Sequence, residues 1–215
     1  MADVVPPSHV WYASYGSNMH ASRLRHYIVG GAPSGARRVY PGCRDRALPG
    51  RSAAVVVPGS VYFATESPVW TGGRGFYDPE AEGTAWCLAH LVTTEQFADI
   101  AAQEMYRTPG ADLDLTAVLT TGRARLGPGR YETLVRLGAL DGLPVLTFTA
   151  PWRMTDVRLR PPSAPYLRHL AAGLAESGAW REDEIAAYLA SCPGAAGHWT
   201  PAAVAALMSA PARTR

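Results

Sequence analysis

The clearest structural signal lies near the N-terminus, in Val10-Trp11-Tyr12-Ala13-Ser14-Tyr15-Gly16-Ser17-Asn18-Met19. The aromatic residues of its first part favour a strand, and residues 19–28 have helical character. Between them lies a tight turn of small residues. Such a turn can present consecutive backbone N–H groups to a carboxylate or an oxyanion. The simpler interpretation is a strand-to-helix connection with Ser17 or Asn18 as the N-cap, and the two roles are compatible.

A second signal is the helix predicted to follow a strand at residues 83–92. It opens with Thr93-Thr94-Glu95-Gln96, a Thr-x-x-Gln capping box. Phe97, Ile100 and Ala101 recur at helical spacing and define a buried stripe. Glu104 falls on the same stripe, four residues after Ile100. Either the helix end frays and Glu104 meets solvent or an arginine, or its carboxylate lies in a pocket suited to proton transfer.

The remaining pattern predicts an α+β fold. Residues 53–57 and 60–64 are expected to form a hairpin around Pro58-Gly59, and residues 65–82 a long loop that forms a lid or the wall of a pocket. Further strands are expected at 112–119, 131–137 and 143–149, and helices at 165–176, at 182–190 and from Thr200-Pro201. We expect a closed or strongly curved, mainly antiparallel sheet with flanking helices and a helical C-terminal tail.

Composition narrows the class of protein. The chain has 215 residues, of which 47% are hydrophobic and 18% charged, with a net charge of +2, so global disorder is excluded. All 20 basic residues are arginine, which excludes Schiff-base and phosphate-loop lysines. No apolar run approaches the roughly 18 residues that span a bilayer, and MADVVPPSHV is not a secretory signal. We therefore expect a soluble cytoplasmic protein without a membrane partner.

The charged and metal-binding residue types give little further signal. The arginines form no basic stripe, so no nucleic-acid partner is expected. One cluster is either a solvated loop or a rim that faces an anion; it contains Arg37, Arg38, Arg44, Arg46 and Arg51. Cys43, Cys87 and Cys192 form no CxxC pair, and the six histidines show no HxxxH spacing. We expect neither a disulfide framework nor a metal, and Cys87 is interpreted as a core residue.

Two of these segments resemble the γ-glutamylcyclotransferase-like family. Tyr12 to Met19 is similar to its opening signature, an aromatic strand that ends in Tyr-Gly-Ser-Asn-Leu/Met. Gly83-Thr84-Ala85-Trp86 leads through a helix to Gln103-Glu104-Met105-Tyr106, at the spacing of the family's catalytic glutamate. Residues 162–167 also look like a segment found in many members. The resemblance covers about residues 10 to 150, and we expect a domain at 8–160 with a helical extension at 161–215 packed on it.

The resemblance implies a small mixed or antiparallel β-barrel that releases 5-oxoproline from a γ-glutamyl amine or peptide. The substrate's α-amine would attack its own γ-carbonyl, with Glu104 as general acid and base and with no cofactor. The substrate-binding residues implied or considered are Tyr15, Gly16, Ser17, Asn18 and Tyr106. For Tyr106, capping the helix end is an equally good role. The implied partner is a small γ-glutamyl molecule, and a homodimer stays open.

Two departures from the family pattern leave the substrate open. Met105 stands where members commonly have glycine and should narrow the pocket mouth, and the 65–82 loop is bulkier than the minimal fold needs. One alternative is other γ-glutamyl amide or acyl-transfer chemistry on a specialised metabolite, and another is a non-catalytic ligand-binding module. A deacetylase is disfavoured because the chain has no Gly-x-Ser-x-Gly elbow and no metal-ligand cluster.

Overall fold

The chain forms two compact units, each assembled from separate stretches of sequence. The computed structural model describes residues 6–32 and 39–210, so Arg37 and Arg38 of the predicted arginine cluster lie outside the described residues. Unit 1 comprises residues up to Ser14, Ala21–Val55 and Leu88–Pro151, and unit 2 comprises Tyr15–His20, Val56–Cys87 and residues from Trp152 onward. The expected domains at 8–160 and 161–215 stay a prediction.

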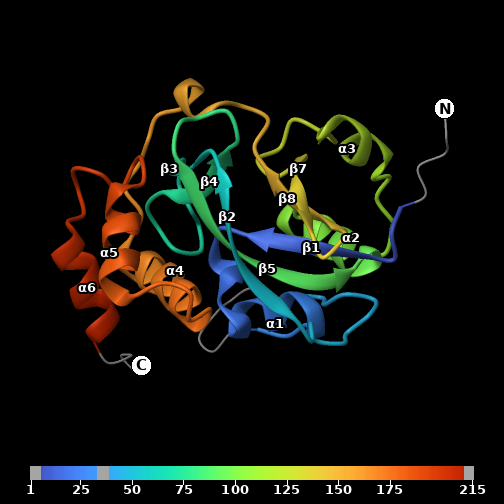
Figure 1. Ribbon diagram of the computed structural model, residues 1–215, viewed down its shortest axis with the longest axis horizontal. Coiled ribbons are helices and arrows are strands. Elements are labelled where there is room, and N and C mark those ends of the chain that lie inside the picture. Colours follow the sequence, from blue (N-terminus) through green and yellow to red (C-terminus); the bar gives the residue numbers. More distant parts are fainter. Residues whose placement is uncertain (1–5, 33–38, 211–215) are drawn as a thin grey trace. The chain divides into compact units, whose positions relative to one another are not determined.

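A six-stranded mixed sheet forms the frame of unit 1 (Figure 1). Its order is β2 (Ser52–Pro58), β5 (Thr84–Thr93), β1 (His9–Ser14), β8 (Leu143–Thr149), β7 (Thr133–Leu140) and β6 (Arg123–Arg125), and β2 and β5 also contribute residues to unit 2. Strand β1 is antiparallel to β5 and parallel to β8. Among the described residues β2 and β6 each have one neighbour in this order, so the predicted closed barrel is not confirmed.

Three helices cover the core of unit 1, namely α1 (Ala21–Val29), α2 (Thr94–Glu104) and α3 (Thr116–Thr121). Their buried side chains pack with those of β1, β5, β7 and β8; the cluster includes Tyr12, Leu24, Tyr27, Ile28, Val92, Phe97, Ile100, Val118, Leu134, Leu146 and Phe148. The strand predicted at 112–119 is wrong. Asp114 Oδ1 accepts a hydrogen bond from Thr116 N at 2.8 Å as α3 begins, and Gly122 ends the helix at φ +82°.

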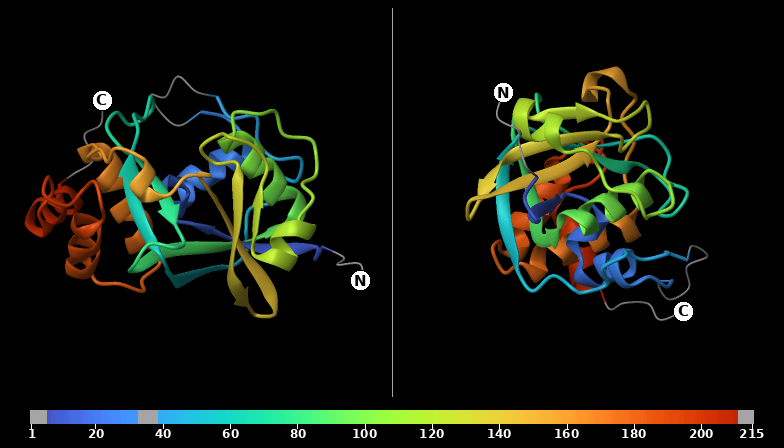
Figure 2. Two further views of the ribbon diagram at one scale, coloured as in Figure 1. Left: turned by 90° about the horizontal axis from the view of Figure 1, so that it is seen from above. Right: turned by 90° about the vertical axis from the view of Figure 1, so that its right-hand side faces the viewer.

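The strands predicted at 131–137 and 143–149 are confirmed as the antiparallel hairpin β7–β8, which Figure 2 shows from two further sides. A register shift between Arg136 and Gly138 bends β7. The Trp11 indole donates a hydrogen bond to Leu140 O at 3.0 Å, and the Thr147 hydroxyl donates to Ala13 O at 2.8 Å. These bonds fix the hairpin against β1.

In unit 2, β3 (Ser60–Ala64) pairs antiparallel with β4 (Arg74–Asp78). The predicted hairpin between 53–57 and 60–64 is therefore wrong, and the predicted loop at 65–82 contains β4. The physical reason lies at Gly59, where φ is +105° and a Cβ atom would come within 2.6 Å of Asp78 O. The turn at Pro58-Gly59 thus packs β3 against the chain after β4 rather than folding it back on β2.

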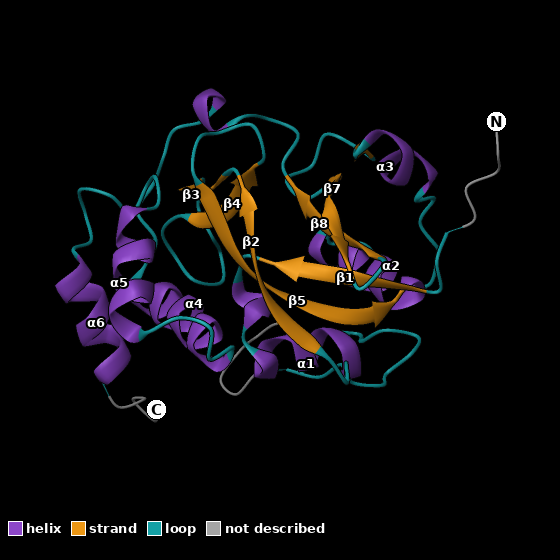
Figure 3. Cartoon of the chain, viewed as in Figure 1, coloured by secondary structure: helices purple, strands orange, loops and turns teal. Residues whose placement is uncertain are grey.

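The C-terminal helices of unit 2 contact one another (Figures 1 and 3). They are α4 (Ala164–Glu176), α5 (Glu182–Ser191) and α6 (Pro201–Ser209), and a short 3-10 turn at Met154–Asp156 precedes them. The predicted N-cap is confirmed, since the Thr200 hydroxyl accepts a hydrogen bond from Ala203 N at 3.2 Å. Helix α4 packs on residues 17–19, and a Cβ atom at Gly173 would lie 2.8 Å from both Met19 Cβ and His20 N.

Candidate active site

Helix α2 carries Glu104 to the edge of the unit 1 core. Its start is fixed by the predicted capping box, in which the Thr93 hydroxyl accepts from Gln96 N and the Gln96 side chain accepts from Thr93 N, each at 3.1 Å. Phe97, Ile100 and Ala101 are buried as predicted. The helix ends at Glu104, which is half-buried, so the carboxylate leaves the buried stripe just where the helix stops.

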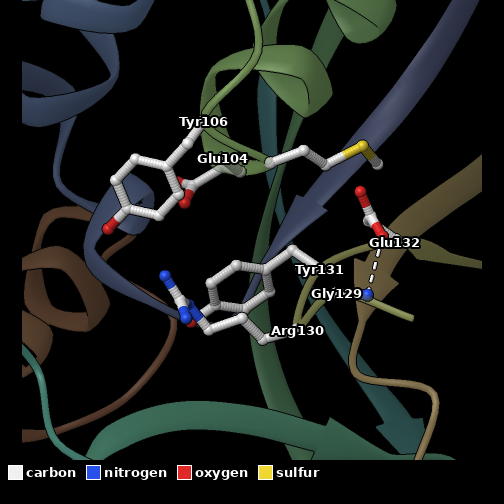
Figure 4. A pocket seen from close by; sticks show the side chains of 7 residues that line it. Glu104, Tyr106, Gly129, Arg130, Tyr131 and Glu132 are labelled. Atoms are coloured by element: carbon white, nitrogen blue, oxygen red, sulfur yellow. Dashed lines mark hydrogen bonds between the residues drawn. The ribbon is translucent and has the colours of Figure 1, made fainter. Parts of the chain in front are cut away.

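Two segments enclose a pocket of about 180 Å³ at this helix end (Figure 4). One contains Glu104, Met105 and Tyr106, and the other runs from Gly129 to Glu132. Met105, at φ −79°, has an ordinary backbone conformation, and its side chain lines the pocket as the sequence predicts. Tyr106, at φ +57°, takes the left-handed conformation and is 54% exposed. The ring of Tyr106 therefore forms the open side of the pocket.

The segment that faces Glu104 is shaped around the carboxylate of Glu132. Gly129 N donates to Glu132 Oε2 at 2.6 Å, and Arg107 forms an ion pair with the same carboxylate. A Cβ atom at Gly127 would come within 2.2 Å of Glu132 Oε2, and one at Gly129 within 2.7 Å. The two glycines thus leave the space that the Glu132 carboxylate fills.

Three carboxylates lie near the end of α2, and their partners distinguish them. Asp99 is fully buried and accepts hydrogen bonds from Arg44 N at 2.8 Å, Arg44 Nε at 3.1 Å and Gly110 N at 3.1 Å. The hydrogen bond between the Arg44 side chain and Asp99 is the main reason that the pKa of Arg44 is raised above its usual range. Glu132 is held by Arg107 and Gly129. Glu104 lines the pocket together with Glu132, and a proton acceptor at the position of Glu104 can reach a ligand there.

The buried phenol of Tyr27 on α1 is hydrogen-bonded to Glu104. Burial is the main cause that raises the pKa of Tyr27 well above its usual value, and the charge of Glu104 raises it further. Tyr27 therefore stays protonated and can donate to the carboxylate. The backbone of Tyr27 is fixed as well, because Gln103 Nε2 donates to Tyr27 O at 2.9 Å. These contacts hold the Glu104 side chain on the inner side of the pocket.

The predicted binding turn lies in unit 2, whereas Glu104 and Tyr106 lie in unit 1. Tyr15 is buried against Tyr77, with ring centroids 5.8 Å apart, and Ser17–Met19 form a 3-10 turn with Gly16 as its N-cap. The helix predicted from Met19 begins at Ala21. Asn18 is buried, and the His169 ring lies 3.1 Å from Ser17 O through Nε2. The turn is thus packed against other residues of unit 2.

Gly16 has no structural requirement for glycine. Its φ of −119° is ordinary extended backbone, and an added Cβ atom would meet only the Tyr166 hydroxyl, at 3.7 Å. A glycine that neither backbone conformation nor packing demands is consistent with close approach of a ligand. This observation supports the binding role that the sequence predicts for the turn.

The chain was compared with family models and with known proteins. No family model matches it. A stretch of 199 residues is 34% identical to "Histone deacetylase 5" of Arabidopsis thaliana, covering 84% of this chain and 30% of that protein. Because the chain spans less than a third of that relative, the deacetylase name describes the longer protein.

Two solved structures are similar to the chain at 14% sequence identity. One is a gamma-glutamyl cyclotransferase, with a TM-score of 0.48 and coverage of 86% of this chain and 89% of that one. The other is an uncharacterized protein of Homo sapiens, with a TM-score of 0.49 and coverage of 87% and 90%. A γ-glutamylcyclotransferase is thus among the solved structures that the chain resembles.

Sequence reasoning missed half of the pocket. It singled out Glu104, Met105 and Tyr106, but not Gly129, Arg130, Tyr131 or Glu132. The available signal was Gly127-Pro128-Gly129, a tight turn directly before charged and aromatic residues that open a strand.

The other predicted features can be compared with the described part of the chain. Three arginines of the predicted cluster lie in the described residues: Arg44 binds carboxylates, Arg51 forms an ion pair with Asp141 at 2.6 Å, and Arg46 donates a hydrogen bond to Pro41 O at 3.4 Å. All three cysteines are free and buried, Cys87 among them. Within residues 6–32 and 39–210, no His, Cys, Asp and Glu side chains gather as a metal site. Over the same ranges, every helix is too short or too polar to cross a bilayer.

Proposed function

We propose that this protein is a γ-glutamylcyclotransferase-like enzyme that releases 5-oxoproline from a γ-glutamyl amine. The observation that carries the proposal is the position of Glu104. Glu104 lines the pocket at the end of α2, and the protonated phenol of Tyr27 is hydrogen-bonded to it from behind. Glu104 is also the residue that the sequence resemblance assigns to catalysis.

The proposed reaction is an intramolecular acyl transfer. The α-amine of the substrate attacks its own γ-carbonyl carbon, which forms the new C–N bond of a five-membered lactam. Glu104 accepts the proton that the attacking amine loses and then gives it to the departing nitrogen as the original C–N bond breaks. No proton is gained or lost overall. Holding the substrate in a folded conformer supplies much of the acceleration, because both reacting groups belong to one molecule.

The other residues have supporting roles in this proposal. Tyr27 holds the Glu104 carboxylate by hydrogen bonding. By the sequence resemblance, Tyr15, Gly16, Ser17 and Asn18 bind the γ-glutamyl unit, and Gly16 is the member whose missing side chain the fold does not explain. Tyr106 and Met105 border the side of the pocket through which the amine leaves.

The decisive test compares wild-type protein with Glu104→Gln on a panel of γ-glutamyl amines, with 5-oxoproline detected by mass spectrometry. We expect the wild type to form 5-oxoproline and the variant to lose at least about a hundredfold in kcat, the usual size of a general acid–base contribution. The matched control is Glu95→Gln. Glu95 is on the same helix, paired with Arg44 at 3.5 Å and away from the pocket, so its variant should keep full activity.

Two results would contradict the proposal. Free glutamate as the product would mean that the protein hydrolyses the γ-glutamyl bond and does not cyclise the substrate. A wild-type protein whose melting temperature rises with a panel member, but which converts none of them, would be a ligand-binding module instead.

A further inference from the structure

Arg130 stands apart from the other arginines around the pocket. Arg107 is paired with Glu132, and Arg44, farther along α2, is paired with Asp99. The guanidinium of Arg130 instead lies over the Tyr106 ring, 5.1 Å from its centroid. Its Nε atom is buried and has no hydrogen-bond partner among the described residues. In Figure 4 the Arg130 side chain lies on the segment of residues 129–132 and extends toward Tyr106 and Glu104 on the facing segment.

This arrangement leaves a permanent positive charge available to a ligand. An arginine stays protonated at any physiological pH, and its planar fork matches the two oxygens of a carboxylate. Stacking on Tyr106 holds the guanidinium in place by a cation–π interaction but does not neutralise it. A buried N–H donor without an acceptor is costly, and a bound anion would remove that cost.

The position of Arg130 indicates which end of a substrate it meets. Glu104 is held from the inner side by the buried Tyr27 phenol, and cyclisation must take place within reach of that carboxylate. Tyr106, on which Arg130 stacks, is 54% exposed and forms the open side. The departing amine must leave toward solvent, so it passes the Tyr106–Arg130 pair.

We propose that Arg130 binds a carboxylate on the departing amine and so selects anionic over neutral amine groups. The inference rests on the proposed cyclotransferase function. Arg130 acts in this proposal as a specificity residue, and the bonds that form and break are those of the cyclisation described above.

Two substrates that differ only in that carboxylate test the inference. They are γ-glutamylalanine and γ-glutamylethylamine, each assayed with wild type, Arg130→Gln and Arg130→Lys. We expect the wild type to prefer γ-glutamylalanine by about tenfold or more in kcat/KM, as for one charge-assisted hydrogen-bonded contact. Arg130→Gln should abolish this preference by slowing γ-glutamylalanine alone. Arg130→Lys keeps the charge but not the fork, and should keep part of the preference.

The control for a general effect of charge is Arg25→Gln. Arg25 lies exposed on α1 in the same unit, and its variant should keep the wild-type preference. Circular dichroism of each variant confirms that it folds. A selectivity ratio is used because a purely structural loss would lower both rates equally.

Different outcomes separate failure of this inference from failure of the proposed function. Equal rates on both substrates in the wild type, or equal slowing of both by Arg130→Gln, would overturn the role of Arg130 and leave the cyclotransferase function intact. If the wild type converts neither these two substrates nor any other γ-glutamyl amine of the panel, the proposed function fails, and calorimetric binding of the same two compounds then tests Arg130 directly. Binding of γ-glutamylalanine that Arg130→Gln does not weaken would overturn the inference.

Discussion

Two glycines of unit 2 show how differently the same residue type is used. At Gly73 an added Cβ atom would come within 2.0 Å of Arg160 O, so the fold itself requires glycine there. At Gly16 the backbone is ordinary and the space is open to a Cβ atom. The absence of a side chain at residue 16 is therefore better explained by a ligand than by packing.

This contrast predicts that Gly16→Ala separates folding from binding. The free energy of unfolding of the variant should lie within about 0.5 kcal/mol of the wild-type value, as is usual for substitutions without a structural conflict. Its KM for the converted γ-glutamyl amine should rise by about tenfold or more, because the new methyl group occupies ligand space. Urea unfolding and steady-state kinetics check the two parts.

The matched variant is Gly73→Ala. Its new methyl group would meet the backbone carbonyl of Arg160, which cannot move aside as a side chain could. We expect Gly73→Ala to have a lower free energy of unfolding than Gly16→Ala in the same urea experiment. A Gly16→Ala protein with unchanged KM would remove the binding role of the turn.

Single residues were predicted best where one local interaction fixes them. The capping box at Thr93 and Gln96 places the start of α2, and helical spacing from there reaches Glu104. Arg130 and Glu132 could not be found in this way. They come to the pocket because residues 129–132 pack against the end of α2, where Glu132 pairs with Arg107, and a contact between segments so far apart in the chain has no local signature in one sequence.

Among the elements of unit 2, β4 holds the segment that precedes α4. Asp78, at the end of β4, accepts hydrogen bonds from Met154 N at 2.9 Å, Arg153 Nε at 3.2 Å and Glu80 N at 3.0 Å. Burial acts to raise the pKa of Asp78, but these donors outweigh it and hold the pKa below its usual value. In its charged form Asp78 therefore joins the end of β4 to residues 153–154.

We predict that Asp78→Asn lowers stability in a pH-dependent way. A carboxylate with a depressed pKa in the folded state stabilises the protein above the unfolded-state pKa of about 4, and this contribution is lost as the pH falls through the folded-state value. The variant should thus be less stable than wild type by about 1–3 kcal/mol at pH 7. The difference should shrink below pH 4, as measured by urea unfolding at both pH values.

Asp183→Asn is the control on α5, where Asp183 pairs with Arg181 at the surface and should contribute little. A difference between wild type and Asp78→Asn that is the same at pH 3 and pH 7 would mean that the charge of Asp78 is not what stabilises the segment.

At the scale of the whole molecule, sequence reasoning identified an α+β fold and most helices but not the way the strands group. The hairpin expected at Pro58-Gly59 failed because β2 joins the large sheet while β3 pairs with β4. The strand expected at 112–119 failed because Thr and Val are common in strands, yet here they begin α3, where the Asp114 carboxylate accepts a hydrogen bond from Thr116 N. In both cases a local pattern favoured one partner or conformation, and another contact was stronger.

Labelling of the three cysteine thiols can follow the unfolding of each unit separately. Cys43 lies in unit 1, and Cys87 and Cys192 lie in unit 2. Burial raises the pKa of each thiol to about 12, so a thiol reagent at pH 8 should label none of them in the folded protein. Because β2 and β5 contribute residues to both units, we predict that labelling of all three begins at the same urea concentration.

Mass-spectrometric mapping of the labelled cysteines along a urea series measures this coincidence. The protein unfolded in high urea, which should label fully, is the control. Labelling of Cys87 and Cys192 well before Cys43 would show that unit 2 unfolds by itself.

The close contact at Gly173 limits which residues can stand at this position in related sequences. With Met19 Cβ and His20 N each 2.8 Å from where its side chain would begin, a mutation at residue 173 cannot be accepted without a compensating change in the turn at residues 16–20. A side chain at residue 173 would therefore need a different conformation of the turn. In any homologous sequence, the residue aligned with Gly173 indicates whether that protein can keep this conformation of the turn.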